Sequence, residues 1–202
     1  MEIAHPRVHA KTLPDKPALI LADTGQSISY AVLVERADQA AALFAQLGLC
    51  EGDTIAILLE NHLHYPELCW AAKNSGITYA CVSNQSSVDD AAYVVDNCDA
   101  KLLISSNALA ETAVQVAQRS RRDLQCLMLD GVCPGFKSYD SLLAIEKAVP
   151  TMGRRRGPSM LYSSGTTGRP KGVRVPLSDD PPEVPPQRLA MLQRLGGTYT
   201  GF

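Results

Sequence analysis

The chain has 202 residues, enough to bury a sizeable core in one domain. Lys and Arg total 19 and Asp and Glu total 21, so the net charge of −2 argues against binding nucleic acid or an anionic membrane through bulk charge. The composition, 46% hydrophobic and 20% charged, is typical of a soluble globular protein and excludes wholesale disorder. No stretch approaches the roughly 18 apolar residues that span a bilayer, and charges and prolines stand where a signal peptide needs an apolar run. We therefore expect a cytoplasmic location and no transmembrane segment.

Predicted elements begin after an irregular, extended arm over residues 1–17, which contains three prolines. Residues 18–29 predict a hairpin with a turn at residues 23–25. Residues 30–47 predict a helix, capped by Ser29 and ended by Gly48. Strands and helices then alternate, in the order strand 54–59, helix 61–75, strand 78–83, helix 88–98, strand 101–105, helix 108–120 and strand 125–129. This alternation predicts an α/β fold with a layered, mainly parallel sheet and flanking helices.

Six cysteines occur, and no pair has the C-x-x-C spacing, so we expect reduced thiols in the core. Two segments resemble linkers: residues 151–158, which include three consecutive arginines, and residues 176–186, which hold five prolines. A short helix over residues 187–195 is expected after the second.

Residues 160–173, MLYSSGTTGRPKGV, carry the most informative pattern. An apolar strand runs into a segment with four hydroxyls and two glycines in six residues, and a lysine follows three residues later. Gly165, Gly168 and Gly172 permit positive φ and close approach to a ligand. Backbone N–H groups, hydroxyls and a lysine can then converge on phosphate oxygens. The candidate phosphate contacts are Ser163, Ser164, Gly165, Thr166, Thr167, Gly168 and Lys171.

Other interpretations of this segment fit less well. The spacing from Gly165 reaches Pro170 and Lys171, not the Gly-Lys-Ser/Thr of a Walker A loop. Neither Ser163 nor Ser164 has the glycine two residues earlier that a nucleophile elbow needs. A Ser/Thr/Gly-rich hairpin turn explains the SSGT tetrad but not the whole string.

The string YSSGTTGRPKGV resembles the phosphate-loop signature of the adenylate-forming enzymes, the AMP-binding superfamily of acyl-CoA synthetases, peptide-synthetase adenylation domains and firefly-type luciferases. Upstream segments resemble the same superfamily in order and spacing, and most resemble fatty-acyl and aryl-acyl CoA ligases. These segments are residues 15–20 (DKPALI), 29–33, 47–53, 55–61 (IAILLEN) and 70–76.

The resemblance implies a two-step reaction. A carboxylate attacks the α-phosphate of ATP in the presence of Mg²⁺, which gives an acyl-adenylate and pyrophosphate, and the thiol of CoA then attacks the adenylate. The loop would bind the β- and γ-phosphates. The implied partners are therefore a small carboxylic acid, ATP and CoA, with no nucleic acid. No residue of this chain is assigned a catalytic or metal-ligating role.

Several family segments have no counterpart here: a Pro-Leu-x-His segment, an adenine-binding Tyr-Gly-x-Thr-Glu segment, a ribose-binding aspartate and a C-terminal domain with a catalytic lysine. We therefore expect the N-terminal portion of the ligase large domain, inactive by itself, with residues 1–175 ending in the phosphate loop and residues 176–202 as a proline-rich linker that begins the next subdomain. The alternative is a non-catalytic nucleotide-binding or interaction fragment of a degenerate ligase. Uncovered strand edges and apolar surface also predict self-association.

Three features are expected to be structural. His62 and His64 suit a capping role better than a metal site, because side chains two residues apart diverge on a helix. The arginines at 154–156 suit a solvated linker better than attraction of ATP. Tyr65 and Trp70 are expected in the core.

Overall fold

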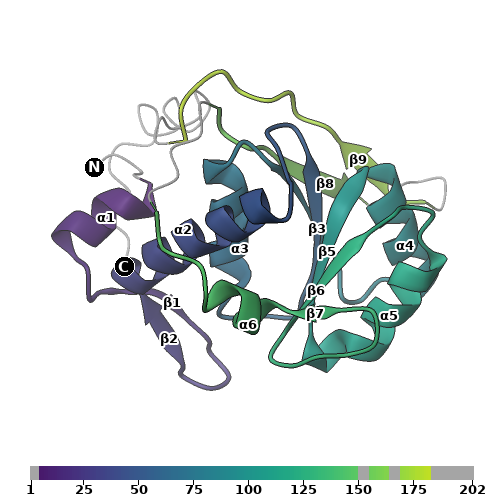
Figure 1. Ribbon diagram of the computed structural model, residues 1–202, viewed down its shortest axis with the longest axis horizontal. Helices are drawn as coiled ribbons and strands as arrows, with labels where there is room; N and C mark the ends of the chain where they lie inside the picture. Colours follow the sequence, from purple (N-terminus) through teal and green to yellow (C-terminus); the bar gives the residue numbers. More distant parts are fainter. Residues whose placement is uncertain (1–4, 150–154, 164–168, 183–202) are drawn as a thin grey trace.

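The computed structural model describes residues 5–149, 155–163 and 169–182, and its main feature is a mixed sheet with helices on both faces (Figure 1). The strands are β1 (Pro17–Ile20), β2 (Ser27–Ser29), β3 (Thr54–Leu58), β4 (Thr78–Val82), β5 (Ala100–Ser106), β6 (Gln125–Leu129), β7 (Lys137–Ser138), β8 (Ser159–Ser163) and β9 (Lys171–Val173). The helices are α1 (Pro6–Thr12), α2 (Tyr30–Gln46), α3 (Tyr65–Asn74), α4 (Val88–Asn97), α5 (Ala110–Arg119) and α6 (Tyr139–Leu143), with a 3₁₀ turn η1 (Asn107–Leu109) before α5.

Within the described residues the main sheet has seven strands in the order β7-β6-β5-β3-β4-β8-β9. Neighbouring strands are parallel from β7 to β8, and β9 alone runs antiparallel to its neighbour. β1 and β2 form a separate antiparallel hairpin. The predicted α/β fold with a mainly parallel sheet and flanking helices is confirmed.

The sheet separates the core into two layers, each covered by helices. Residues of α2, α3 and α6 pack on one face of the sheet, and residues of α4 and α5 pack on the other. Strand β3 is buried throughout, with Ile55 and Ile57 in the first layer and Ala56 and Leu58 in the second. A continuous apolar run is what a strand covered on both faces requires.

The long helix α2 follows its sequence signals. The Val32 amide donates to the Ser29 hydroxyl at 3.3 Å, which caps the first turn. The apolar residues Leu33, Ala37, Ala41 and Phe44, spaced three or four apart along one face, are buried, and Gly48 after the last turn has φ of 80°. The helix ends at Gln46, one residue before the predicted end.

The predicted extended arm is wrong at residues 6–12, which form α1. Pro6 occupies the first turn, where its missing N–H costs nothing, and the His5 ring accepts from the Arg7 amide. Arg7 also forms a two-pronged ion pair with Asp38 of α2, at 2.7 and 2.8 Å. Tertiary contact therefore stabilises a helix too short to show periodicity.

The cysteine prediction is partly wrong. All six are free, as expected, but only Cys98 and Cys126 are buried, whereas Cys50 is exposed and the others are partly exposed. The expected helix at 187–195 and the first part of the expected linker at 151–158 lie outside the described residues. No helix in the described part of the chain has the length and apolarity to cross a membrane.

The β9 edge carries exposed apolar side chains. Leu161 on β8 and Val173 on β9 lie opposite each other, and the two residues are 60% and 59% exposed, respectively. Because an unpaired apolar edge promotes pairing between chains, we expect concentration-dependent self-association in sedimentation velocity, reduced by Val173→Lys. A monomer at every concentration would contradict this expectation.

Candidate functional site

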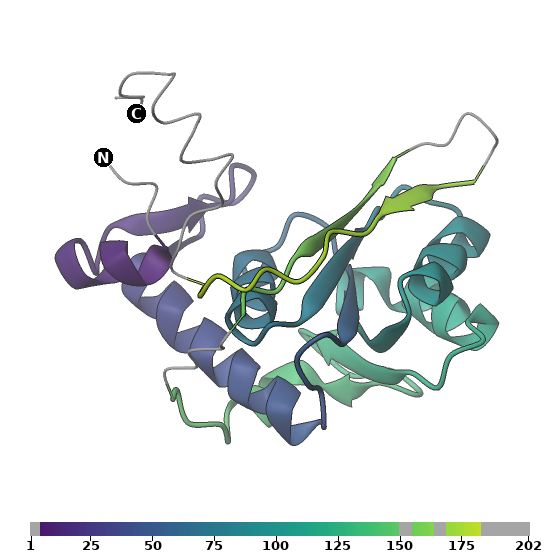
Figure 2. The same cartoon turned by 90° about the horizontal axis from the view of Figure 1, so that it is seen from above.

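The signature segment forms a β-hairpin at the edge of the sheet. Its first strand, β8, lies parallel to β4, and its return strand, β9, runs back beside β8 (Figure 2). The register of the two strands places Lys171 directly opposite Ser163. Both residues are exposed; Ser163 directly precedes the segment 164–168, and Lys171 follows it by three residues. Five of the seven predicted contacts lie outside the described residues: Ser164, Gly165, Thr166, Thr167 and Gly168. The structure thus brings together the two predicted contacts that it describes.

Contacts beneath the hairpin hold β8 and β9 against the sheet. The Tyr162 hydroxyl donates to the Asn97 side chain at 2.8 Å, and Met160 is buried against the second layer of the core. A Cβ atom on Gly172 would lie 2.5 Å from the Met160 side chain and 2.8 Å from the Tyr162 ring. Gly172 has no positive φ, so the prediction that it supplies one is wrong. Its role is close packing across the hairpin.

The chain after β9 returns alongside the start of β8. The Arg156 amide donates to the Asp180 carbonyl at 3.1 Å, and Arg155 pairs with Asp179 at 2.9 Å. The solvated linker predicted here is therefore wrong for Arg156, whose side chain is only 15% exposed, whereas Arg155 is exposed as expected and Arg154 lies outside the described residues. These contacts join the two ends of the hairpin, which fixes its position relative to β4.

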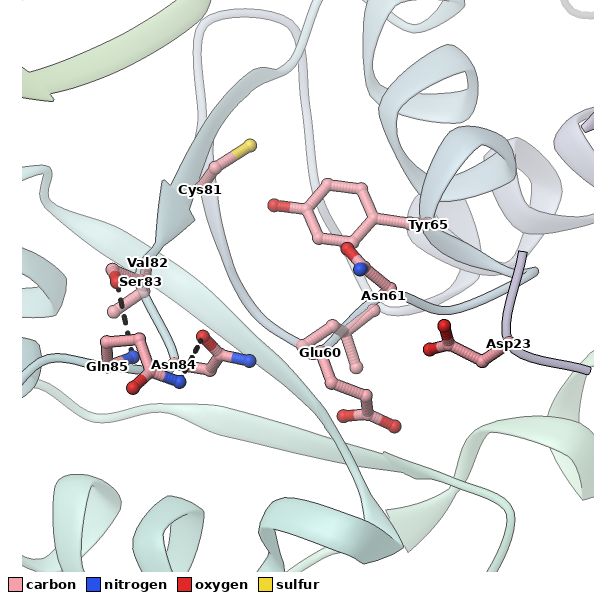
Figure 3. Close-up of a pocket in the computed structure, with 10 residues that line it drawn as sticks. Asp23, Glu60, Asn61, Tyr65, Cys81, Val82, Ser83, Asn84 and Gln85 are labelled. Carbon is pink, nitrogen blue, oxygen red and sulfur yellow. Dashed lines mark hydrogen bonds between the residues drawn. The ribbon is translucent and has the colours of Figure 1, made fainter. Parts of the chain in front are cut away.

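A cavity of about 750 Å³ opens at the carboxyl ends of β3 and β4 (Figure 3). It is lined by Asp23, Leu59, Glu60, Asn61, Tyr65, Cys81, Val82, Ser83, Asn84 and Gln85. The Glu60 carboxylate accepts a hydrogen bond from the Ser106 hydroxyl at 2.5 Å. Most of the lining residues carry polar side chains, and Leu59, Cys81 and Val82 are the apolar ones.

The topology explains why the cavity lies there. β3 continues into α3 on one face of the sheet, and its neighbour β4 continues into α4 on the other. A crevice opens where adjacent parallel strands diverge in this way, and ligands of open α/β sheets bind there. Because β8 is parallel to β4, its carboxyl end with Ser163 points to the same edge of the sheet as the cavity.

Sequence reasoning missed this cavity. The signal was present, because polar residues follow both strands, at Glu60-Asn61 after β3 and at 83–85 after β4. The prediction of a core position for Tyr65 is wrong in part, since its ring lines the cavity. The Trp70 ring packs edge-on against the His5 ring, which is a structural contact.

The two histidines have structural partners, as predicted, but not because they diverge on a helix: α3 begins at Tyr65, four residues after the predicted start, and the two rings stack 5.1 Å apart. The His62 ring accepts from the His64 amide at 3.2 Å, and its other nitrogen lies 2.7 Å from the Asp130 carboxylate. His64 contacts Glu67 at 3.0 Å. Across the described ranges, no group of three His, Cys, Asp or Glu side chains could hold a metal ion.

Comparison with known proteins assigns the chain to a family. The family model described as AMP-binding enzyme matches residues 7–177. The chain belongs to the AMP-binding enzyme family. The resemblance found in the signature and the upstream segments is thereby confirmed.

Curated relatives of this chain include CoA ligases. A 2-succinylbenzoate–CoA ligase of Bacillus licheniformis is 26% identical over 86% of this chain and 34% of its own length. A crotonobetaine/carnitine–CoA ligase of Salmonella arizonae is 30% identical over 79% of this chain and 33% of its own. The chain spans about a third of the length of these curated relatives.

Solved structures share the fold. The anthranilate–CoA ligase AuaEII, solved with anthranoyl-AMP, matches with a TM-score of 0.71 at 19% identity over 86% of this chain and 35% of its own. A benzoate–CoA ligase of Burkholderia xenovorans matches with a TM-score of 0.67 at 21% identity, over 83% of this chain and 32% of its own. The sheet and its helices are thus those of adenylate-forming ligases.

Proposed function

We propose that this chain is the phosphate-binding N-terminal part of an ATP-dependent, AMP-forming acid–CoA ligase. The observation that carries the proposal is the hairpin register, which places Ser163 opposite Lys171 at the base of a Ser/Thr/Gly-rich loop in an AMP-binding family member. In this proposal residues 1–175 end in the phosphate loop, and residues 176–202 lead into a further subdomain.

The proposed chemistry is electrostatic. A carboxylate attacks the α-phosphate of ATP, and the bond to the departing pyrophosphate breaks. Lys171, the Ser163 hydroxyl and the loop amides would hold the β- and γ-phosphates and neutralise the charge that grows on the leaving group. Such positioning requires no proton transfer from the loop, so these residues act by binding and by charge neutralisation, and none is assigned as an acid, a base or a nucleophile.

The other reactants follow from the reaction type. Mg²⁺, which neutralises phosphate charge when bound, would arrive with ATP. The acid and CoA are the remaining substrates, because an acyl-adenylate needs both an acid to form it and a thiol to consume it. The relatives are named for different acids, so the proposal specifies a carboxylic acid as a class.

Titration calorimetry of ATP·Mg²⁺ into the chain tests the proposal. A charge-assisted hydrogen bond contributes about 1.5–3 kcal/mol, so Lys171→Ala should weaken saturable binding roughly tenfold or more. Lys137→Ala is the matched control, because it removes an exposed strand lysine at the opposite end of the sheet order. Equal affinities for wild type and Lys171→Ala, or an equal loss in Lys137→Ala, would contradict the assignment.

A further inference from the structure

Two cysteines lie between helix α3 and strand β4, on the sheet face that α3 covers. Tyr65, Cys69 and Lys73 occur at four-residue spacing and therefore share one face of α3. Tyr79 and Cys81 are two residues apart on β4 and share one face of the sheet. Both cysteines pack against the same core layer, and the Lys73 ammonium lies 5.9 Å from the centre of the Tyr79 ring. The helix face that carries Cys69 thus contacts the strand face that carries Cys81.

The surroundings of the two thiols differ. The two thiols are neighbours across the contact between α3 and β4, close enough for each to shift the pKa of the other, and Figure 3 shows the Tyr65 side chain beside Cys81. The hydrogen bond from Cys69 lowers the pKa of Cys81, aided by Tyr65 and by the nearby Lys73 charge. The same pairing, together with burial, raises the pKa of Cys69. The lowered pKa and the place of Cys81 in the cavity lining, which does not include Cys69, together assign the nucleophilic role to Cys81.

Cys81 is also accessible, because it lines the cavity at the carboxyl ends of β3 and β4. Burial raises the pKa of Cys98 and of Cys126 to about 11, so these two thiols stay protonated and unreactive near neutral pH. Burial raises the pKa of Cys133 as well. A thiolate that faces a cavity and has a second thiol beside it is the arrangement that redox-sensitive cysteine pairs require.

We propose that Cys69 and Cys81 form a reactive dithiol, which a peroxide converts to an intramolecular disulfide joining α3 to β4 at the wall of the cavity. The Cys81 thiolate attacks one peroxide oxygen, the O–O bond breaks and the second oxygen leaves as hydroxide, which takes up a proton. Cys81 is then a sulfenic acid. The Cys69 thiolate attacks its sulfur, the S–O bond breaks, and hydroxide leaves and becomes water with the proton that Cys69 gave up. In sum, two thiols are oxidised and one peroxide is reduced to two waters.

The dithiol is independent of the phosphate loop. Its residues belong to α3 and β4, and none of them is a predicted phosphate contact. A disulfide there would alter the cavity wall while leaving Ser163 and Lys171 unchanged. A negative result in the test of the dithiol would therefore leave the proposed ATP site unaffected.

The test is peptide mapping by mass spectrometry of the reduced chain after treatment with hydrogen peroxide. We expect a Cys69–Cys81 linked peptide and a loss of two hydrogen masses, both reversed by a dithiol reductant. In Cys69→Ser, dimedone should label Cys81 as a trapped sulfenic acid. Cys133→Ser is the matched control, because it removes a partly exposed thiol outside the pair and should leave the linked peptide unchanged.

A measurement on the unaltered chain keeps the test independent of variant folding. Alkylation by iodoacetamide near neutral pH, followed for each cysteine, should modify Cys81 faster than the exposed Cys50. Peroxide that oxidises Cys50 or Cys133 while Cys69 and Cys81 stay reduced would overturn the proposal. Alkylation of Cys81 at the slow rate of Cys98 would overturn it as well.

Discussion

Replacing Glu67 by glutamine is expected to lower the free energy of unfolding by about 3 kcal/mol, because it breaks a buried ion pair by removing one partner's charge. The Glu67 side chain is fully buried and accepts hydrogen bonds from Arg36 at 2.6 Å and from the Tyr139 hydroxyl at 2.7 Å. His64 lies 3.0 Å from the same carboxylate. The variant would leave the Arg36 guanidinium facing a neutral amide in a site built for an anion.

Urea denaturation followed by circular dichroism measures this loss. Glu35→Gln is the matched control, since Glu35 is an exposed acid beside Arg36 on α2 and should change stability by less than about 0.5 kcal/mol. Equal stabilities of the two variants would show that the buried carboxylate contributes nothing through its charge.

The ion pair between Glu67 and Arg36 also predicts that the free energy of unfolding depends on pH. Burial alone would raise the pKa of Glu67, but hydrogen bonds from His64, Arg36 and Tyr139 outweigh burial and lower it. A lowered pKa in the folded state stabilises the protein above the unfolded pKa, about 4.3, and the stabilisation is lost as the pH falls through the folded value. The stability difference between wild type and Glu67→Gln should therefore be full at neutral pH and shrink below about pH 4.3. A difference that widens in acid would contradict this assignment.

Replacing Gly157 by alanine is expected to cost about 3 kcal/mol, the upper end of overpacking penalties. A Cβ atom at this position would lie 2.1 Å from the Ile77 carbonyl oxygen and 2.6 Å from the Ala72 carbonyl oxygen. Both obstacles are backbone atoms, which cannot rotate away as the end of a side chain can. The Gly157 amide also donates to the Lys73 carbonyl at 2.9 Å, and this bond holds the entry to β8.

Beyond the loss of overall stability, we expect Gly157→Ala to disturb strand β8 locally. Hydrogen exchange of the β8 amides should accelerate in Gly157→Ala, and ATP affinity should fall, because β8 carries the loop. Gly131→Ala is the matched control, since its Cβ would meet only the Asn107 side chain, at 3.1 Å. If the β8 amides of Gly157→Ala exchanged at the wild-type rate, the close approach of Gly157 to its neighbours would not position the hairpin.

The fold was largely predictable because its elements carry strong local signals. β3 is a continuous apolar run, and α2 combines a cap with one apolar face, so both were predicted to within one residue. α1, β7 and α6 were missed because elements of two to seven residues are too short to show a period. Their formation depends on contacts such as that of Arg7 with Asp38, which no local pattern reveals.

The candidate site was likewise predictable only in part. The signature segment was recognisable from its residue types, but the pairing of Ser163 with Lys171 depends on a hairpin register that spacing alone does not determine. Glu67 would be taken for an exposed acid in the first turn of a helix, yet distant residues bury it. The close approach of Gly157 to α3 and to Ile77, just before β4, is likewise a property of the assembled fold.

The central claim is that the β8–β9 hairpin holds the phosphates of ATP. Amide chemical-shift mapping by ¹H–¹⁵N NMR during titration with ATP·Mg²⁺ tests it most directly, because each backbone N–H reports its own surroundings. We expect the largest shifts from Ser163 through Lys171 and at the cavity rim formed by residues 83–85, with little change in β7 at the opposite end of the sheet. Saturable shifts that cluster elsewhere, with residues 163–171 unaffected, would contradict it.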